Sequence, residues 1–142
     1  MLRRTEMELP LSDRTKNKII KVLESRDNIS FAYIYGSSLM DITTARDLDI
    51  AIFLRIYTGL IESECKEAEE IKEALESVIN KPVDVKVLNE APIEFQLEVT
   101  ETGMLLYISD EDEFTTYLES LSRKAIETIQ YRYSIEGELC RL

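Results

Sequence analysis

The chain has 142 residues, a length that suits one domain with its own hydrophobic core. Its net charge of −11 opposes binding to a nucleic-acid backbone, so we expect a basic protein as partner and no direct nucleic-acid contact. The absence of histidine excludes imidazole catalysis and the usual zinc ligands, which leaves carboxylate and metal chemistry. No apolar run is long enough for a membrane span and no secretory signal is present, so a cytoplasmic location is expected.

Apolar patterns predict four elements in the first half of the chain: a helix at 11–26, strands at 29–35 and 48–54, and a helix at 61–80. The strand at 48–54 is apolar on both faces, which is typical of a central strand covered on both sides. The inward stripe of the helix at 61–80 is predicted to include Cys65 as a small core residue. Its charged face, which includes Glu64, is predicted to lie in solvent.

The second half is predicted to form a strand at 83–88, a helix at 91–102, a short edge strand at 104–108 and a last helix from about 110 to 133. Pro92 suits the first turn of its helix, and Gly103 suits the stop. Ser109 and Asp112 have the spacing of a capping box for the last helix. That helix is predicted to end near Tyr133, and the residues after it to fray.

The order of these elements predicts the fold class α/β (α+β), a small mixed β-sheet with flanking helices. We expect a single domain over residues 1–142. Its core is predicted at about 11–108, followed by the C-terminal helix.

Polar residues with a chemical role gather around the two strands at 29–35 and 48–54. Asp47 and Asp49 are two positions apart on an extended strand, so their side chains point to the same face. Carboxylates placed side by side repel each other unless a cation lies between them, and hard oxygen ligands suit Mg²⁺. Gly36 allows the backbone to approach a ligand closely, and Ser37 at a helix start suits a phosphate. This equipment indicates phosphoryl or nucleotidyl transfer.

The spacing of these residues resembles a known signature. Gly36-Ser37, followed after nine residues by Asp47-Leu48-Asp49, is similar to the motif of the polymerase-β-like nucleotidyltransferases. Asp84, within Val83-Asp84-Val85, stands where that family has its third carboxylate. The segments at 88–92 and 103–107 resemble the later part of the minimal nucleotidyltransferase (MNT) antitoxins.

The resemblance implies the polymerase-β-like fold and a full set of site residues. Two Mg²⁺ ions would be held by Asp47, Asp49 and Asp84. The phosphates of ATP would be bound by Gly36, Ser37, Ser38 and Arg46. The implied activity is transfer of AMP from ATP to a tyrosine of a cognate HEPN-type RNase toxin, which the chain would neutralise as its antitoxin, with an oligomer of the two proteins as one possibility. Asp84 could also accept the proton of the acceptor hydroxyl.

Simpler interpretations of the same residues stay open. Asp47 and Asp49 could face solvent at a strand start, Ser37 could only cap a helix, and Arg46 could pair with the carboxylates instead of a triphosphate. Tyr131 and Tyr133 read either as partner contacts or, the simpler prediction, as aromatic packing at a helix end.

Two other functions are also compatible with the sequence. A non-catalytic antitoxin could mask a basic toxin by contact alone. An adenylyltransferase acting on a small molecule is the third possibility, although a second domain to hold the acceptor would have no room in this chain.

Overall fold

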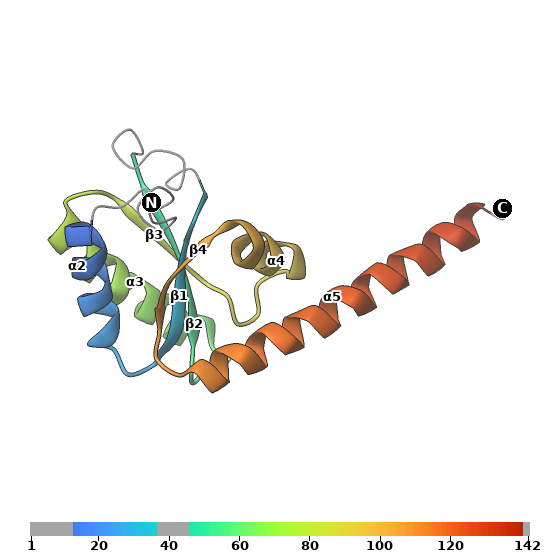
Figure 1. The fold of residues 1–142 in the computed structure, drawn as a ribbon, viewed down its shortest axis with the longest axis horizontal. Helices are drawn as coiled ribbons and strands as arrows, with labels where there is room; N and C mark the ends of the chain where they lie inside the picture. Colours follow the sequence, from blue (N-terminus) through green and yellow to red (C-terminus); the bar gives the residue numbers. More distant parts are fainter. Residues whose placement is uncertain (1–12, 37–45, 141–142) are drawn as a thin grey trace, which may run out of the picture.

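The computed structural model describes residues 13–36 and 46–140 (Figure 1). The start predicted for the first helix, the turn predicted at 37–41 and nearly all of the loop predicted at 42–46 lie outside these residues. The elements follow one another as α2 (Asp13–Glu24), β1 (Ile29–Tyr35), β2 (Leu48–Leu54), α3 (Ile61–Ile79), β3 (Val83–Val87), α4 (Ile93–Thr102), β4 (Met104–Ile108) and α5 (Glu111–Cys140). Within the two described ranges, none of the helices combines the length and the apolar character that a membrane crossing requires.

The strands form a mixed sheet in the order β3-β2-β1-β4. Both β2 and β4 pair with β1 in antiparallel fashion, and β3 pairs with β2 in parallel. A parallel pair needs a crossover connection, and α3 supplies it between β2 and β3. The predicted fold class, the central place of β2 and the edge position of β4 are confirmed.

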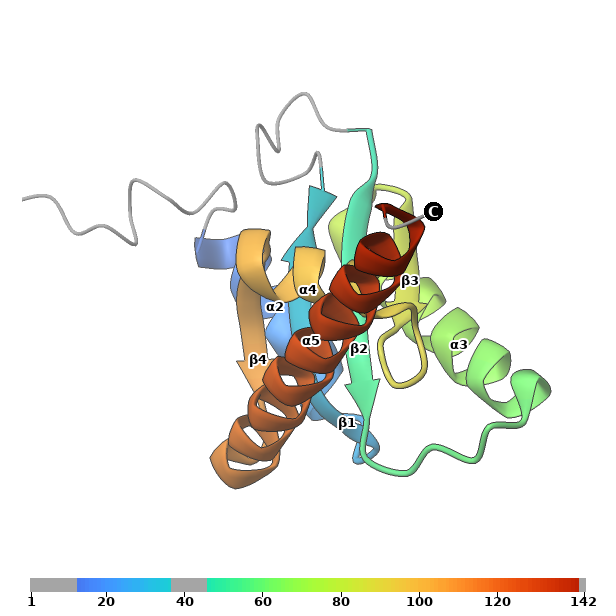
Figure 2. The same ribbon diagram turned by 90° about the vertical axis from the view of Figure 1, so that its right-hand side faces the viewer.

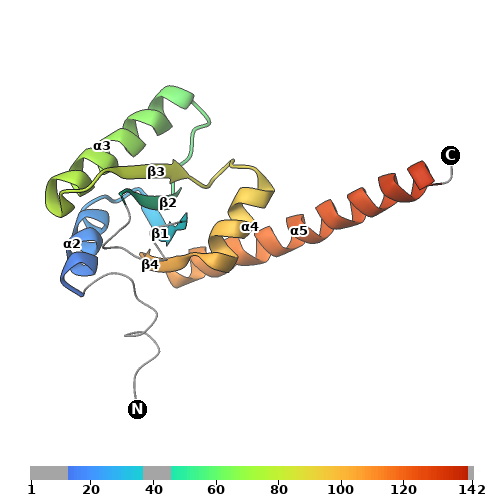
Figure 3. The ribbon, with the colours of Figure 1, turned by 90° about the horizontal axis from the view of Figure 1, so that it is seen from above.

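Helices cover both faces of the sheet. One face packs against α2 and α3, and the other against α4 and α5 (Figures 1 and 3). Along β2 the residues alternate, with Leu48, Ile50 and Ile52 in the first core and Ala51 in the second. Because the strand alternates, the odd-numbered residues of β2 face α4 and α5.

Phe31 of β1 lies at the centre of the second core and is fully buried. Its ring stacks on Phe53 with centroids 5.0 Å apart, and it contacts Phe114 at 4.9 Å and Tyr117 at 4.8 Å. These aromatic contacts attach the first turns of α5 to the sheet. They fix the direction in which the rest of that helix continues.

The first turn of α3 differs from the prediction. Cys65 is exposed, and Glu64 is buried instead. The Oε1 atom of Glu64 accepts hydrogen bonds from the backbone N–H and the hydroxyl of Thr58, both at 3.0 Å, and from the N–H of Gly59 at 3.3 Å. The carboxylate thus satisfies backbone donors ahead of the helix, and this need outweighs the apolar stripe at this point.

The N-terminal cap of α5 is also not the predicted one. Asp110 Oδ1 accepts the backbone N–H of Asp112 at 2.8 Å and that of Glu113 at 3.2 Å. The hydroxyl of Ser109 donates instead to the Ser30 carbonyl at 2.9 Å and accepts from Arg55 at 2.7 Å. Ser109 therefore ties the helix start to the sheet, and the capping box is wrong by one residue.

The length of α5 is the largest departure from the prediction. The helix runs to Cys140, past the end predicted near Tyr133, and the residues after Tyr133 continue it (Figures 1 and 2). No proline follows to stop it, and the single Gly137 costs a helix only about 1 kcal/mol. Tyr131 and Tyr133 are both exposed, so the prediction that they pack at a helix end is wrong.

Candidate functional site

The parallel pairing of β2 and β3 brings two of the predicted aspartates together. Asp49 and Asp84 are direct partners in the register of these strands, although they are far apart in the sequence. Alternation places both on the face that α4 and α5 cover, since their neighbours Leu48 and Val83 belong to the opposite core. Asp47 precedes β2 and is exposed. The site thus lies at one end of the sheet, where β2 begins.

The carboxylate of Asp49 stands in a strongly negative environment. Burial raises the pKa of Asp49, and the charges of Asp84 and Asp47 raise that pKa further, while Lys86 opposes them. Lys86 shares a strand face with Asp84, and its Nζ lies 3.7 Å from Asp84 Oδ2. Lys86 thus neutralises part of the negative charge of the three aspartates. The remaining negative charge favours binding of a further cation at this place.

Gly36 ends β1 beside this acidic group. Its φ of +76° lies in the left-handed region that favours glycine. A Cβ atom added at Gly36 would lie 2.7 Å from Asp49 Oδ2. The glycine therefore allows the backbone to approach the carboxylate of Asp49. The sequence predicted a close approach to a phosphate at this residue, and that stays a prediction.

The structure places the remaining predicted residues less fully. Arg46 is exposed, directly before Asp47. Ser37 and Ser38 lie outside the described residues, between Gly36 and Arg46 in the chain. One end of the segment that carries them, Gly36, lies against Asp49, and the other end, Arg46, directly precedes Asp47.

Tyr35 is a site residue that the sequence analysis missed. It pairs with Asp49 across β1 and β2, and its ring packs edge-on against Phe95 of α4 at a centroid distance of 5.4 Å. Burial raises the pKa of Tyr35 above its usual range, and the charges of Asp49, Asp84 and Glu98 raise it further. The phenol is thus held neutral. Its position was readable from the sequence, because Tyr35 shares strand parity with buried Phe31 and directly precedes Gly36.

The donor chemistry of the site suits a hard divalent cation. In residues 13–36 and 46–140, no three acidic or cysteine side chains are already gathered closely enough to hold a metal ion. Asp47, Asp49 and Asp84 nevertheless offer oxygen ligands alone, and their mutual repulsion is relieved by positive charge. Lys86 beside Asp84 occupies part of that role. The three aspartates therefore fit Mg²⁺.

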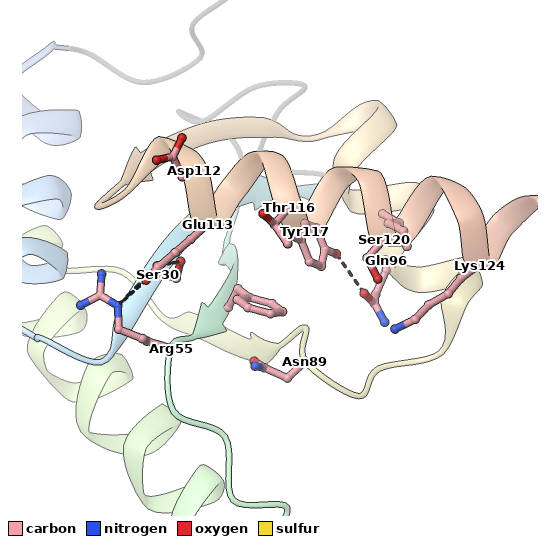
Figure 4. Close-up of a pocket in the computed structure, with 12 residues that line it drawn as sticks. Ser30, Arg55, Asn89, Gln96, Asp112, Glu113, Thr116, Tyr117, Ser120 and Lys124 are labelled. Atoms are coloured by element: carbon pink, nitrogen blue, oxygen red, sulfur yellow. Dashed lines mark hydrogen bonds and ion pairs between the residues drawn. The ribbon is translucent and has the colours of Figure 1, made fainter.

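A cavity of about 540 Å³ opens elsewhere on the same face of the sheet (Figure 4). It is lined by Phe53 and Arg55, at the far end of β2 from Asp49, and by residues of α4 and α5. The hydroxyl of Tyr117 donates to Gln96 Oε1 at 2.9 Å, and Arg55 pairs with Glu113 at 2.9 Å (Figure 4). Its lining comes from four separate elements, so no local sequence pattern predicted it.

The fold and the paired aspartates define a small α+β domain with an acidic site at the start of β2. The family model described as "Polymerase beta, Nucleotidyltransferase" matches residues 17–112, more than half of the chain. The chain belongs to the polymerase-β nucleotidyltransferase family. The predicted family resemblance is confirmed, and with it the class of enzyme.

Several solved structures with the same fold are toxin–antitoxin assemblies. A chain of the crystal structure of the toxin–antitoxin MntA–HepT is 20% identical, with 90% of this chain and 99% of that chain covered and a TM-score of 0.62. A chain of the structure of a tri-AMPylated Shewanella oneidensis HEPN toxin in complex with MNT antitoxin is 21% identical, with 91% of this chain and 99% of that chain covered and a TM-score of 0.63. A chain of a toxin–antitoxin structure with AMP-PNP is 23% identical, with 87% of this chain and 98% of that chain covered and a TM-score of 0.62.

At these identities the likeness concerns the fold. At the level of sequence, none of the curated proteins compared with the chain matches it.

Proposed function

We propose that this nucleotidyltransferase transfers AMP from ATP to a tyrosine hydroxyl of a HEPN-type toxin, with Mg²⁺, and so acts as an antitoxin. The observation that carries the proposal is the register pairing of Asp49 with Asp84, with Asp47 close enough to raise the pKa of Asp49. Among the structures of the same fold, one contains a tri-AMPylated HEPN toxin with an MNT antitoxin, and another contains AMP-PNP. Both fit the proposed donor and acceptor.

Each residue has a role in this proposal. Asp47, Asp49 and Asp84 would hold Mg²⁺, as two ions, and the bound metal would neutralise phosphate charge and support departure of pyrophosphate. The phosphates of ATP are bound by Gly36, Ser37, Ser38 and Arg46. The acceptor hydroxyl forms a bond to the α-phosphorus, the bond from that phosphorus to pyrophosphate breaks, and Asp84 accepts the hydroxyl proton.

A non-catalytic antitoxin is the second candidate, because one observation favours it. The C-terminal part of α5 exposes several large apolar side chains, which give the chain a binding surface outside the acidic site. Masking a toxin by contact would need only that surface.

The small-molecule alternative is less well supported. The described cavity lies at the far end of β2 from Asp49, so an acceptor bound in it would not reach the aspartates.

The test is to incubate the chain with ATP, Mg²⁺ and the product of the neighbouring gene as the proposed partner, and to weigh that partner intact. Added AMP units that are lost in Asp84→Asn support transfer. Asp27→Asn, which removes an exposed charge from a loop, is the matched control and retains transfer. A tight complex without a mass change favours masking, and transfer to RNA ends with the partner untouched contradicts both candidates.

A further inference from the structure

The C-terminal part of α5 extends away from the sheet (Figures 1 and 3), and Arg132 still ties it to Glu94 of α4. We call residues 122–135 the arm. Five large apolar side chains are exposed there, with exposed fractions of 56% for Ile126, 54% for Ile129, 68% for Tyr131, 72% for Tyr133 and 38% for Ile135. The arm is a regular helix, so these side chains form a surface and not a collapsed tail.

The exposed side chains occupy more than one side of the helix. Ile126, Ile129 and Tyr133 follow the spacing of one stripe, whereas Tyr131 lies roughly opposite Ile129 at 100° per residue. A helix that is apolar on several sides is normally surrounded by protein. A single helix packed against the arm would cover one stripe only. A groove that receives the arm from several sides would cover them all.

The charge of the arm differs from that of the rest of the protein. Arg123, Lys124 and Arg132 stand against one acid, Glu127, so the arm carries +2 and the remainder of the chain −13. Arg132 is paired with Glu94 of α4. Arg123 and Lys124 have no ion-pair partner within the described part of the chain. The two cations at the root of the arm are therefore available to acidic groups of another protein.

The cavity continues this surface at the root of the arm. Lys124 extends beside Gln96 at its mouth, and Phe53, Tyr117 and Leu121 give it an apolar lining (Figure 4). A protein that encloses the arm would also cover the cavity mouth. Such a protein can place an acidic side chain against Lys124 and an apolar one behind it.

The position of the arm relates it to the acidic site. The arm extends from the side of the sheet on which α4 and α5 lie, and Asp49 and Asp84 face the same side (Figures 1 and 3). A protein that holds the arm is therefore kept on the side where a hydroxyl must reach the aspartates.

We propose that the arm inserts into an apolar groove with an acidic rim on the protein that carries the acceptor hydroxyl. The arm and the adjoining cavity fix that protein, and the aspartates act on it. The identity of the bound protein as the acceptor rests on the proposed function, whereas the docking itself does not. If the partner binds the arm, the negative charge of the rest of the chain is not what mainly selects that partner.

The first experiment measures by calorimetry the affinity for the purified HEPN-type toxin that is proposed as the partner. Ile126→Asp/Ile129→Asp is expected to weaken binding at least about tenfold, since buried apolar anchors carry most of an interface's affinity. The matched control is Ile56→Asp/Ile61→Asp, which changes two side chains of 70% and 79% exposure in the β2–α3 loop and at the start of α3. It is expected to bind as the parent does. Lys124→Glu is likewise expected to weaken binding. Its control, Lys66→Glu on α3, is expected to bind as the parent does.

The second set of measurements separates docking from transfer. The arm variants should raise the KM for the partner and keep the kcat, while melting temperature with Mg-ATP stays unchanged. Asp84→Asn should lose transfer and keep binding. Partner binding by the parent without any transfer would refute the proposed function and leave the docking standing.

Two results would overturn the docking proposal. One is unchanged partner binding by Ile126→Asp/Ile129→Asp. The other is light scattering that shows the chain alone to be a dimer which this double variant dissociates, because the arm would then bind a second copy.

Discussion

At Gly36 the backbone lies so close to the carboxylate of Asp49 that there is no room for a side chain. Gly36→Ala would force Asp49 away, because the new Cβ would lie 2.7 Å from Oδ2. Misplacement of a reacting group by about 1 Å costs on the order of 100-fold in rate, and we expect a loss of AMP transfer of that size. Transfer is measured by intact mass of the partner over time.

Gly59→Ala separates backbone strain from this contact. Gly59 has nearly the same φ, +75°, but nothing lies within 4 Å of the position of its Cβ. This variant should lose some stability and keep its activity at a temperature where it is folded. An equal loss of activity in both variants would show that strain, and not displacement of Asp49, is responsible.

The negative charge of Asp49 should lower the free energy of unfolding of the metal-free protein. Because its pKa is raised in the folded state, its contribution is favourable below the unfolded pKa and is lost as pH rises through the folded pKa. Asp49→Asn should therefore stabilise the metal-free chain at pH 7 by up to about 1 kcal/mol, and by less near pH 3. Urea unfolding at both pH values measures this. With saturating Mg²⁺ the parent should instead be more stable than Asp49→Asn. If Asp49→Asn is less stable than the parent at pH 7 without metal, the electrostatic argument is contradicted.

Among the elements, α4 and α5 are joined by a buried polar contact between the described residues Tyr117 and Gln96. Tyr117→Phe removes the hydroxyl that donates to Gln96 and leaves a buried oxygen unsatisfied. This should lower the free energy of unfolding by about 1–3 kcal/mol. Tyr107→Phe is the control, since the Tyr107 hydroxyl has no hydrogen-bond partner among the described residues. Equal effects of the two variants in urea unfolding would show that the contact contributes nothing.

Apolar periodicity was sufficient to predict where the helices and strands lie, because each pattern is local. The errors occur where distant groups decide the outcome. Glu64 is buried because Thr58 and Gly59 need an acceptor, and Ser109 is drawn to Ser30 of another strand. The end of α5 was predicted too early, because no proline follows Tyr133 and the helix continues to Cys140.

The aspartates of the site were predictable because strand parity and motif spacing are properties of the sequence. Their pairing in register, the contact of Gly36 with Asp49 and the place of Tyr35 depend on how three strands align. The cavity depends on α5 lying across the sheet, which no pattern within one element encodes.

For the whole molecule, Mg-ATP should act as a stabilising ligand. A ligand that binds only the folded state at a hundredfold excess over its Kd adds about 2.7 kcal/mol to the free energy of unfolding. The expected result is a higher Tm with Mg-ATP than with Mg²⁺ or ATP alone. Asp47→Asn/Asp49→Asn should remove that increase. The absence of any rise in the parent would count against a nucleotide site.

The parallel pairing of β2 with β3 has a consequence for the order of folding. Asp49 and Asp84 are 35 positions apart, and they meet only after α3 has closed the crossover between their strands. Closing such a long loop is slow and entropically costly, so the pair should form after the rate-limiting barrier. Bound Mg-ATP would then slow unfolding and leave the refolding rate nearly unchanged. The nucleotide would prolong the lifetime of the finished domain without helping to build it.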